Sequence, residues 1–176
     1  KKGLKKEEGI IMAEMMADMG VDAIEVSCGI GEDGISSVRG DLHIDVALEK
    51  YPMYKKQNPV LKFIMKHFGE QIIKPVPFSE SYNRSVAREI KAKVKIPIFV
   101  VGGMTDPSVM EDVIEKGDAD YISLCRALIA NPGFPEKIAG GSREPSMCIH
   151  CNLCVYNMYT SPLRCFHGNK EKLMQI

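Results

Sequence analysis

The sequence predicts an α/β fold in which short parallel strands alternate with helices. Residues 96–101 form a nearly continuous apolar run, as expected for a parallel strand that is covered on both faces. A helical pattern over 107–116 and an apolar stretch over 119–124 follow within the length of one βαβ crossover. The same order of helix, glycine and strand occurs earlier, over 7–27. We therefore expect three strands that belong either to a (β/α) barrel or to a doubly wound sheet.

The first element is a helix over residues 7–19 with one apolar face. Its large apolar residues recur at helical spacing: Ile11, Met12, Met15, Met16 and Met19. We expect this methionine stripe to lie in the core. Gly20 ends the helix, and residues 21–27 follow as a short strand.

The helix over 107–116 has signals at both ends. Asp106 is an N-cap residue, and Pro107 stands at the first helical position, where its missing N–H costs nothing. Gly117 offers a left-handed stop. The boundaries of this helix are therefore predicted from local chemistry alone.

A long stretch over residues 28–80 separates the first strand from the later unit. Its glycines and prolines indicate an elaborated loop. Within it, residues 60–68 have the spacing of a short amphipathic helix. Residues 82–93 predict a second helix, directly before the strand that begins at Ile96.

Composition narrows the classes of function. The 176 residues are 45% hydrophobic, which is enough for a sizeable core. The 23 Lys and Arg residues balance the 23 Asp and Glu residues, so no overall field favours nucleic acid or an acidic membrane surface. The apolar runs are far shorter than the roughly 20 residues that cross a bilayer, and no signal segment opens the sequence. We expect a cytoplasmic protein with no nucleic-acid or membrane partner.

Chain length bears on the choice between a barrel and a sheet. An eight-stranded barrel takes about 250 residues, and three strands do not close one. The sequence opens with Lys1 and leads straight into a helix. If the fold is a barrel, we expect only its C-terminal part here, with sheet edges that another part must cover.

Two loops after the predicted strands are candidates for anion binding. Ligands gather at the carboxyl ends of strands in α/β folds because free backbone N–H groups lie there. Gly102 and Gly103 permit close approach of a phosphate, while Cys125 and Arg126 add backbone donors and a guanidinium. The alternative is that the glycines only turn the chain and that Arg126 is a solvated surface charge.

Four of the six cysteines form a C-x2-C-x2-C-x10-C pattern, and they are Cys148, Cys151, Cys154 and Cys165. Three closely spaced thiols and a distant fourth are typical of a cubane iron–sulfur cluster. A Cys₄ zinc site more often separates two C-x2-C pairs by 15 to 20 residues, so zinc is the second interpretation and inert thiols the third. His150 lies between two of these cysteines, and we expect its side chain to point outward.

The sequence resembles the NADH:flavin oxidoreductase, or old yellow enzyme, family over most of residues 7–168. The strings that carry this resemblance are GVDAIEVSCG (20–29), IPIFVVGGMTDPSVMEDVIEKGDADYISLCRALIANPGFPEKI (96–138) and CIHCNLC (148–154). The combination is most similar to the multidomain iron–sulfur branch, which includes dienoyl-CoA reductases, trimethylamine dehydrogenase and bile-acid-type enoate reductases. The resemblance implies the C-terminal portion of a (β/α)8 TIM barrel, about strands six to eight, followed by a cysteine-rich segment that binds a cluster.

The resemblance also implies site residues. It assigns Gly102, Gly103, Cys125 and Arg126 to the FMN phosphate, although the family commonly has glycine where this chain has Cys125. It supports cluster ligation by the four cysteines, with a final gap slightly shorter than is usual. Some relatives carry a proton-donating His in the loop that matches residues 29–34, which has none here. No catalytic residue is therefore assigned.

The function implied is that of an FMN-dependent oxidoreductase. NAD(P)H would reduce FMN, the flavin would pass hydride to an activated alkene, and a [4Fe-4S] cluster would carry electrons to a further redox domain. The domains expected are a partial barrel over 1–143 and a cluster-binding segment over 144–176. The partners expected are the missing barrel half and that redox domain, with homo-oligomerisation left open. The alternative is a catalytically silent barrel fragment, or a metal-stabilised interaction module completed by another polypeptide.

Overall fold

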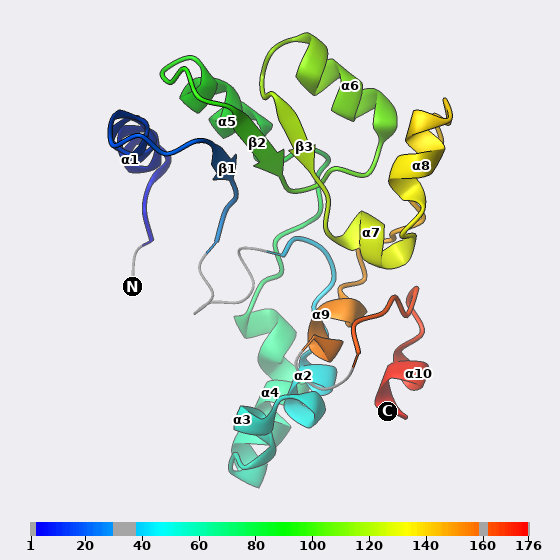
Figure 1. The fold of residues 1–176 in the computed structure, drawn as a ribbon. Coiled ribbons are helices and arrows are strands. Elements are labelled where there is room, and N and C mark those ends of the chain that lie inside the picture. Colours follow the sequence, from blue (N-terminus) through cyan, green and yellow to red (C-terminus); the bar gives the residue numbers. More distant parts are fainter. Residues whose placement is uncertain (1–2, 30–37, 159–161, 176) are drawn as a thin grey trace.

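The computed structural model describes residues 3–29, 38–158 and 162–175 of the chain. These residues form two lobes, one above the other in Figure 1. We call residues 3–29 and 79–147 the sheet lobe, and the remaining described residues the helical lobe. Within the described residues no helix is both long and apolar enough to span a bilayer.

The sheet lobe contains three parallel strands in the order β1-β2-β3. These are β1 (Ile24–Val26), β2 (Ile98–Val101) and β3 (Tyr121–Ser123). Val26 pairs with Val100, which in turn pairs with Ile122 on the other side. All three predicted strands are confirmed, each shorter than its apolar pattern, and the carboxyl ends of the strands lie at one edge of the sheet.

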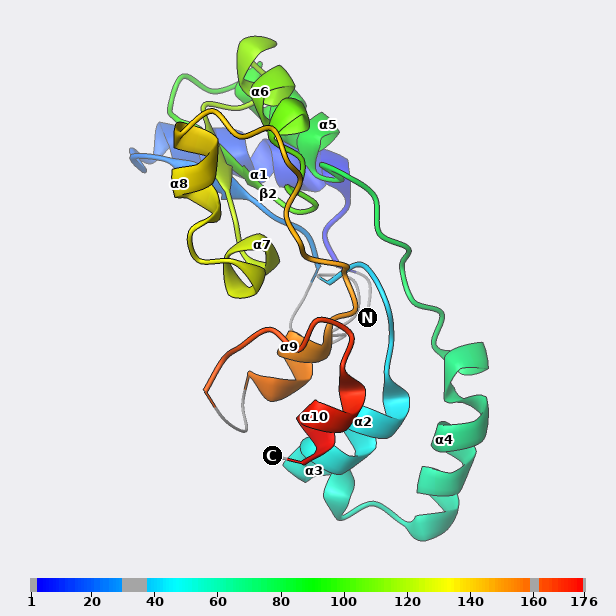
Figure 2. The same ribbon diagram turned by 90° about the vertical axis from the view of Figure 1, so that its right-hand side faces the viewer.

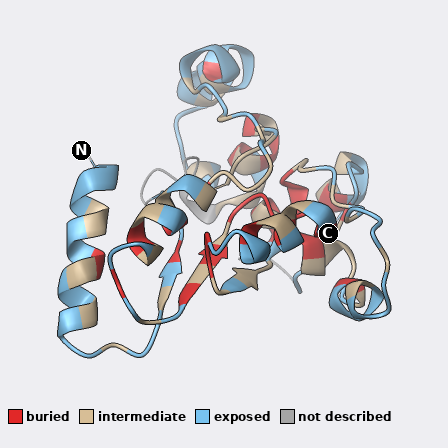
Figure 3. Ribbon diagram, turned by 90° about the horizontal axis from the view of Figure 1, so that it is seen from above, coloured by how far each residue is buried: buried red, intermediate tan, exposed pale blue. Residues whose placement is uncertain are grey.

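Five helices complete the sheet lobe: α1 (Lys6–Asp18), α5 (Arg84–Lys91), α6 (Pro107–Glu115), α7 (Arg126–Ala130) and α8 (Phe134–Ala139). They enclose the larger of two apolar cores. Its most buried members are Ala87, Ile98, Val100, Val113, Ala119, Ala127 and Phe134. Among the strands, burial is greatest on β2, where Ile98 and Val100 are buried, whereas no residue of β3 is buried (Figure 3).

The residues predicted to begin and end the helix over 107–116 do so in α6. The Asp106 carboxylate accepts a hydrogen bond from the Ser108 N–H at 2.8 Å, with Pro107 at the first helical position. Gly117 ends α6 with a φ of +67°. Beyond it, the buried Asp118 carboxylate accepts from Arg84 Nε at 2.6 Å, which ties the end of α6 to α5.

The methionine stripe on α1 is not in the core, contrary to the prediction. Met15 is 60% exposed and Met19 is 83% exposed, and Ala13 is the buried residue of this helix. α1 packs against α5 and contributes to the core through a narrow face formed by Ile10, Ala13 and Ala17. The helix beside the N label in Figure 3 is accordingly mostly pale blue and tan. Periodicity identifies an apolar face, but it does not say whether a neighbour covers that face.

The helical lobe is built from two segments that are far apart in the chain. The stretch predicted as a loop over 28–80 folds in part into α2 (Ile44–Lys50), α3 (Pro52–Lys55) and α4 (Pro59–Ile72). The predictions missed α2 and α3, whereas α4 confirms and extends the amphipathic helix. The C-terminal segment adds α9 (Leu153–Asn157) and α10 (Lys170–Met174).

A second apolar core joins these two segments, as Figure 2 makes visible where α2, α9 and α10 lie together. Its buried members are Val46, Leu153, Tyr156, Phe166 and Leu173. Because Val46 comes from the first segment and the others from the second, the cysteine-rich segment shares its core with α2. The predicted domain boundary between residues 143 and 144 stays a prediction.

Candidate functional site

A pocket of about 280 Å³ lies at the carboxyl ends of the three strands. Residues that directly follow each strand line it, including Ser27 after β1 and the two glycines after β2. All four residues predicted to hold a phosphate line this one pocket: Gly102, Gly103, Cys125 and Arg126. The structure therefore brings them together, while their role in binding phosphate stays a prediction.

Both glycines are required by the protein's own packing. Gly102 has a φ of +117°, and a Cβ there would come within 2.5 Å of the Tyr82 ring. A Cβ at Gly103, where φ is +71°, would clash with the Ser79 carbonyl oxygen. The chain over 79–82 thus lies directly against the glycine pair, with the Ser81 N–H donating to the Gly103 carbonyl at 2.8 Å. The glycines alone therefore do not indicate a phosphate, and the case for one depends on Arg126.

Arg126 is the first residue of α7, and its guanidinium is held by two acceptors. Nη1 donates to the Arg39 carbonyl oxygen at 2.6 Å and to Asn152 Oδ1. No described residue accepts from Nε or Nη2. The side chain also lines the small cavity between the cysteines, so it lies between the two candidate sites. It is not a solvated surface charge.

His150 lines the pocket at the strand ends and does not line the cavity between the cysteines, which agrees with the expectation that its side chain points outward from the predicted ligands. Its ring stacks on Phe78 with 3.3 Å between the ring centroids and a 12° angle between the ring planes. Nε2 is buried and has no hydrogen-bond partner among the described residues. Burial, with the nearby Arg126 charge, lowers the pKa of His150, so the ring is neutral at pH 7.

The four predicted cluster ligands line one cavity of about 10 Å³ beside Arg126, and they are Cys148, Cys151, Cys154 and Cys165. Burial raises the pKa of the Cys154 thiol to about 11 and also raises that of Cys148. Within the described ranges, no group of three His, Cys, Asp or Glu side chains is arranged to hold a metal ion. The structure thus places the four cysteines around one cavity, and metal binding by them is not shown.

Hydrogen bonds anchor the cysteine segment to the chain that follows β1. His43 Nε2 is 3.0 Å from the Cys151 carbonyl oxygen, and the His43 backbone N–H donates to the Tyr156 hydroxyl at 2.8 Å. Asn152 Nδ2 donates to the Asp41 carbonyl oxygen at 3.0 Å. Sequence reasoning assigned no role to His43 or Asn152. The one sequence feature that could have drawn attention to Asn152 was its position between two predicted cysteine ligands.

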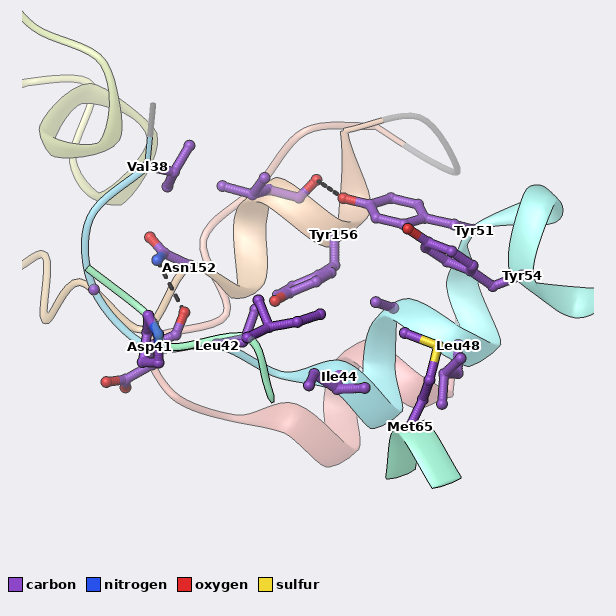
Figure 4. Close-up of a pocket in the computed structure, with 15 residues that line it drawn as sticks. Val38, Asp41, Leu42, Ile44, Leu48, Tyr51, Tyr54, Met65, Asn152 and Tyr156 are labelled. Carbon is purple, nitrogen blue, oxygen red and sulfur yellow. Dashed lines mark hydrogen bonds between the residues drawn. The ribbon is translucent and has the colours of Figure 1, made fainter. Parts of the chain in front are cut away.

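A separate apolar cavity of about 160 Å³ lies within the helical lobe (Figure 4). Tyr156 lies across it from Ile44, with Tyr51 and Tyr54 at one end and Asn152 at the other. The Asn152–Asp41 hydrogen bond closes that second end. This cavity has Val38 and Val155 in common with the pocket at the strand ends, so the two adjoin.

Comparison with known proteins gives a family match. A profile of the NADH:flavin oxidoreductase / NADH oxidase family matches residues 54–144. The chain is 25% identical over 161 residues to 4,4'-dithiodibutanoate disulfide reductase of Rhodococcus erythropolis, covering 90% of this chain and 38% of that protein. It is 30% identical over 151 residues to NADH oxidase of Thermoanaerobacter brockii, covering 85% of this chain and 18% of that protein.

A shorter match links the chain to cinnamate reductase of Clostridium sporogenes. The two are 41% identical over 49 residues, which cover 28% of this chain and 7% of that protein. This chain therefore spans well under half the length of each of these three relatives.

Proposed function

Because this chain belongs to the NADH:flavin oxidoreductase / NADH oxidase family, we propose that it is part of an FMN-dependent oxidoreductase that reduces an activated alkene with NAD(P)H. FMN, when bound, accepts a hydride from the nicotinamide and donates one to the substrate. A relative named cinnamate reductase supports an alkene as the substrate class. The chain's own contribution in this proposal is to hold the cofactor.

The observation that carries the proposal is the convergence of Gly102, Gly103, Cys125 and Arg126 on one pocket at the strand ends. The Nε and Nη2 edge of Arg126 has no acceptor among the described residues, and this edge is the fork that binds a phosphate in bidentate fashion. α7 begins at Arg126, and no side chain caps its first backbone N–H groups, which are further donors for an anion.

A buried polar atom without a hydrogen-bond partner in the wall of this pocket also supports the binding of a polar ligand. A buried nitrogen without a hydrogen bond costs about 1 to 3 kcal/mol, and a ligand group that bonds to it recovers that cost. His150 Nε2 is such an atom. As the ring is neutral, Nε2 serves as a donor or an acceptor according to which nitrogen carries the proton.

We further propose that the four cysteines bind a [4Fe-4S] cluster. In a cubane each thiolate binds a different iron, so the four sulfur atoms need not converge on one point as they must around zinc. The raised pKa of Cys154 means that a bound metal must stabilise its thiolate at neutral pH. The Arg126 charge beside the four sulfur atoms favours an anionic cluster. The cluster, when bound, carries single electrons.

In the complete protein we propose that the remaining barrel strands cover the exposed face of α1 and that a further redox domain takes the electrons. The 680 Å³ hollow between α1 and β1, lined by Met12, Ala13 and Val26, supports the first of these partners. A cytoplasmic location remains part of the same proposal.

The test is a cofactor assay on the intact protein, purified without oxygen. We expect a flavin absorption peak, iron with acid-labile sulfide, and loss of most FMN on replacing Arg126→Met. Zinc in place of iron would overturn the cluster assignment. Purified protein that neither contains nor takes up flavin would overturn the oxidoreductase assignment and would favour an interaction module.

A further inference from the structure

We propose that Asn152 is a positioning residue for the flavin phosphate, because it holds Arg126 from within the cysteine-rich loop. This inference rests on the proposed role of Arg126 as a phosphate ligand. Asn152 itself lines the cavity between the cysteines and the apolar cavity of the helical lobe, and it reaches the strand-end pocket only through Arg126.

Both ends of the Asn152 side-chain amide are used. Oδ1 accepts from Arg126 Nη1, and Nδ2 donates to the Asp41 carbonyl oxygen at 3.0 Å. The residue is 6% exposed, so these bonds are shielded from water. Its backbone is left-handed, with a φ of +58°, a conformation that asparagine tolerates better than most residues. The position therefore combines an unusual backbone with a fully bonded side chain.

The chain around Gly40 is shaped to allow this contact. Gly40 has a φ of +129°, and a Cβ there would clash with the His150 carbonyl oxygen and lie 3.0 Å from Asn152 Nδ2. The Asp41 N–H donates to the same His150 carbonyl at 3.1 Å. Three segments thus meet at one point: residues 39–41 after β1, Arg126 after β3, and the cysteine-rich loop.

This junction fixes which edge of the Arg126 guanidinium is free. The two Nη1 hydrogens are taken by Asn152 and by the Arg39 carbonyl oxygen. The opposite edge, formed by Nε and Nη2, has the geometry for a phosphate fork. Without Asn152, Nη1 keeps one anchor and the long side chain regains rotamer freedom, which phosphate binding must then remove. Asn152 therefore raises phosphate affinity by ordering Arg126 in advance.

The experiment compares FMN with riboflavin, which lacks the phosphate. The variant is Asn152→Gly, because glycine adopts a φ of +58° without strain. Dissociation constants are measured by flavin fluorescence quenching on the intact protein after its flavin is removed. We expect FMN to bind about fivefold to tenfold more weakly to the variant, as for one lost charge-assisted hydrogen bond, and riboflavin to bind as before.

Asn157→Ala is the matched control. Asn157 is buried in the same segment, and its Nδ2 donates to the Pro162 carbonyl oxygen at 2.7 Å. This substitution removes a buried amide of equal size away from the junction, so it should leave the preference for FMN over riboflavin unchanged. If Asn152→Gly does not fold, Asn152→Ser, whose hydroxyl is too short to span both partners, replaces it.

The outcomes distinguish a failure of the proposed role of Asn152 from a failure of the proposed phosphate site. In an Arg126→Met background, Asn152→Gly should alter the FMN dissociation constant less than twofold, since its partner is already gone. A wild-type protein that prefers FMN, with a glycine variant that keeps this preference in full, would overturn the role of Asn152 alone. A wild-type protein that binds FMN and riboflavin equally would overturn the proposed phosphate site, and this inference with it.

Discussion

The sheet lobe and the helical lobe achieve burial in different ways. In the sheet lobe, most buried members of the larger core come from the continuous segment 79–147, and α1 and β1 add Ala13 and Val26. In the helical lobe, α2 meets α9 and α10, which lie about a hundred residues further along. The lesson is that the cysteine-rich segment depends on a distant part of the chain for its shape.

This difference has consequences for local stability. The core of the helical lobe has few buried members, and bringing its two segments together costs chain entropy. Regions with a small apolar core open at a lower free energy than the rest of a protein. We therefore expect the helical lobe to open while the sheet lobe stays folded.

The largest effect is expected from Leu173→Ala. Leu173 is fully buried in the smaller core, and truncating it should destabilise the helical lobe by about 3 kcal/mol. Hydrogen exchange should then speed up in α2 as well as in α10. Val113→Ala, at an equally buried position in the sheet lobe, is the control and should leave the exchange of α2 unchanged. Unaltered exchange in α2 of the Leu173 variant would show that the two segments do not stabilise each other.

A smaller effect is expected where the chain after β1 meets the cysteine-rich loop. Gly40→Ala introduces a Cβ that clashes with the His150 carbonyl oxygen, at a backbone φ that alanine avoids, and should cost about 2 kcal/mol. Gly20→Ala is the control, because Gly20 also has a positive φ, of +88°, but a Cβ there meets nothing within 4 Å. Urea unfolding should show the larger loss for Gly40. Equal losses would mean that backbone conformation alone matters and that the contact with the cysteine-rich loop is not tight.

The smallest effect concerns a surface ion pair of the sheet lobe and its dependence on pH. Asp120 accepts hydrogen bonds at 2.7 Å from Lys91 Nζ and from the Ile98 N–H. Partial burial raises the pKa of Asp120, but these bonds and the Lys91 charge outweigh it, and the net pKa is lowered. Asp120→Asn should therefore cost about 1 kcal/mol at pH 7, a modest value since the pair is partly screened by water.

The sign of the pH dependence follows from that lowered pKa. The contribution of Asp120 is complete above the unfolded-state value of about 3.9 and is lost as the pH falls through the folded-state value. Thermal unfolding of both proteins should therefore show a gap at pH 7 that shrinks below pH 4. A gap that stays constant down to pH 2 would show that the carboxylate charge contributes nothing.

Local chemistry in the sequence determined much of the sheet lobe. Asp106 and Gly117 fixed the ends of α6 through bonds and a backbone conformation that involve only neighbouring residues. The apolar runs gave three parallel strands, and the residues after them converge on one pocket because parallel strands share an edge. The spacing of the cysteines likewise predicted that four thiols would meet around one cavity.

Tertiary structure decided the remaining features, because they depend on contacts between residues distant in sequence. Whether the α1 methionines are covered depends on which face meets α5, and the helical pattern carries no information about that choice. The roles of His150 and Asn152 arise where the chain after β1 packs against the cysteine-rich loop. The type of a residue determines which groups its side chain can bond to, and only the fold determines which of those groups lies next to it.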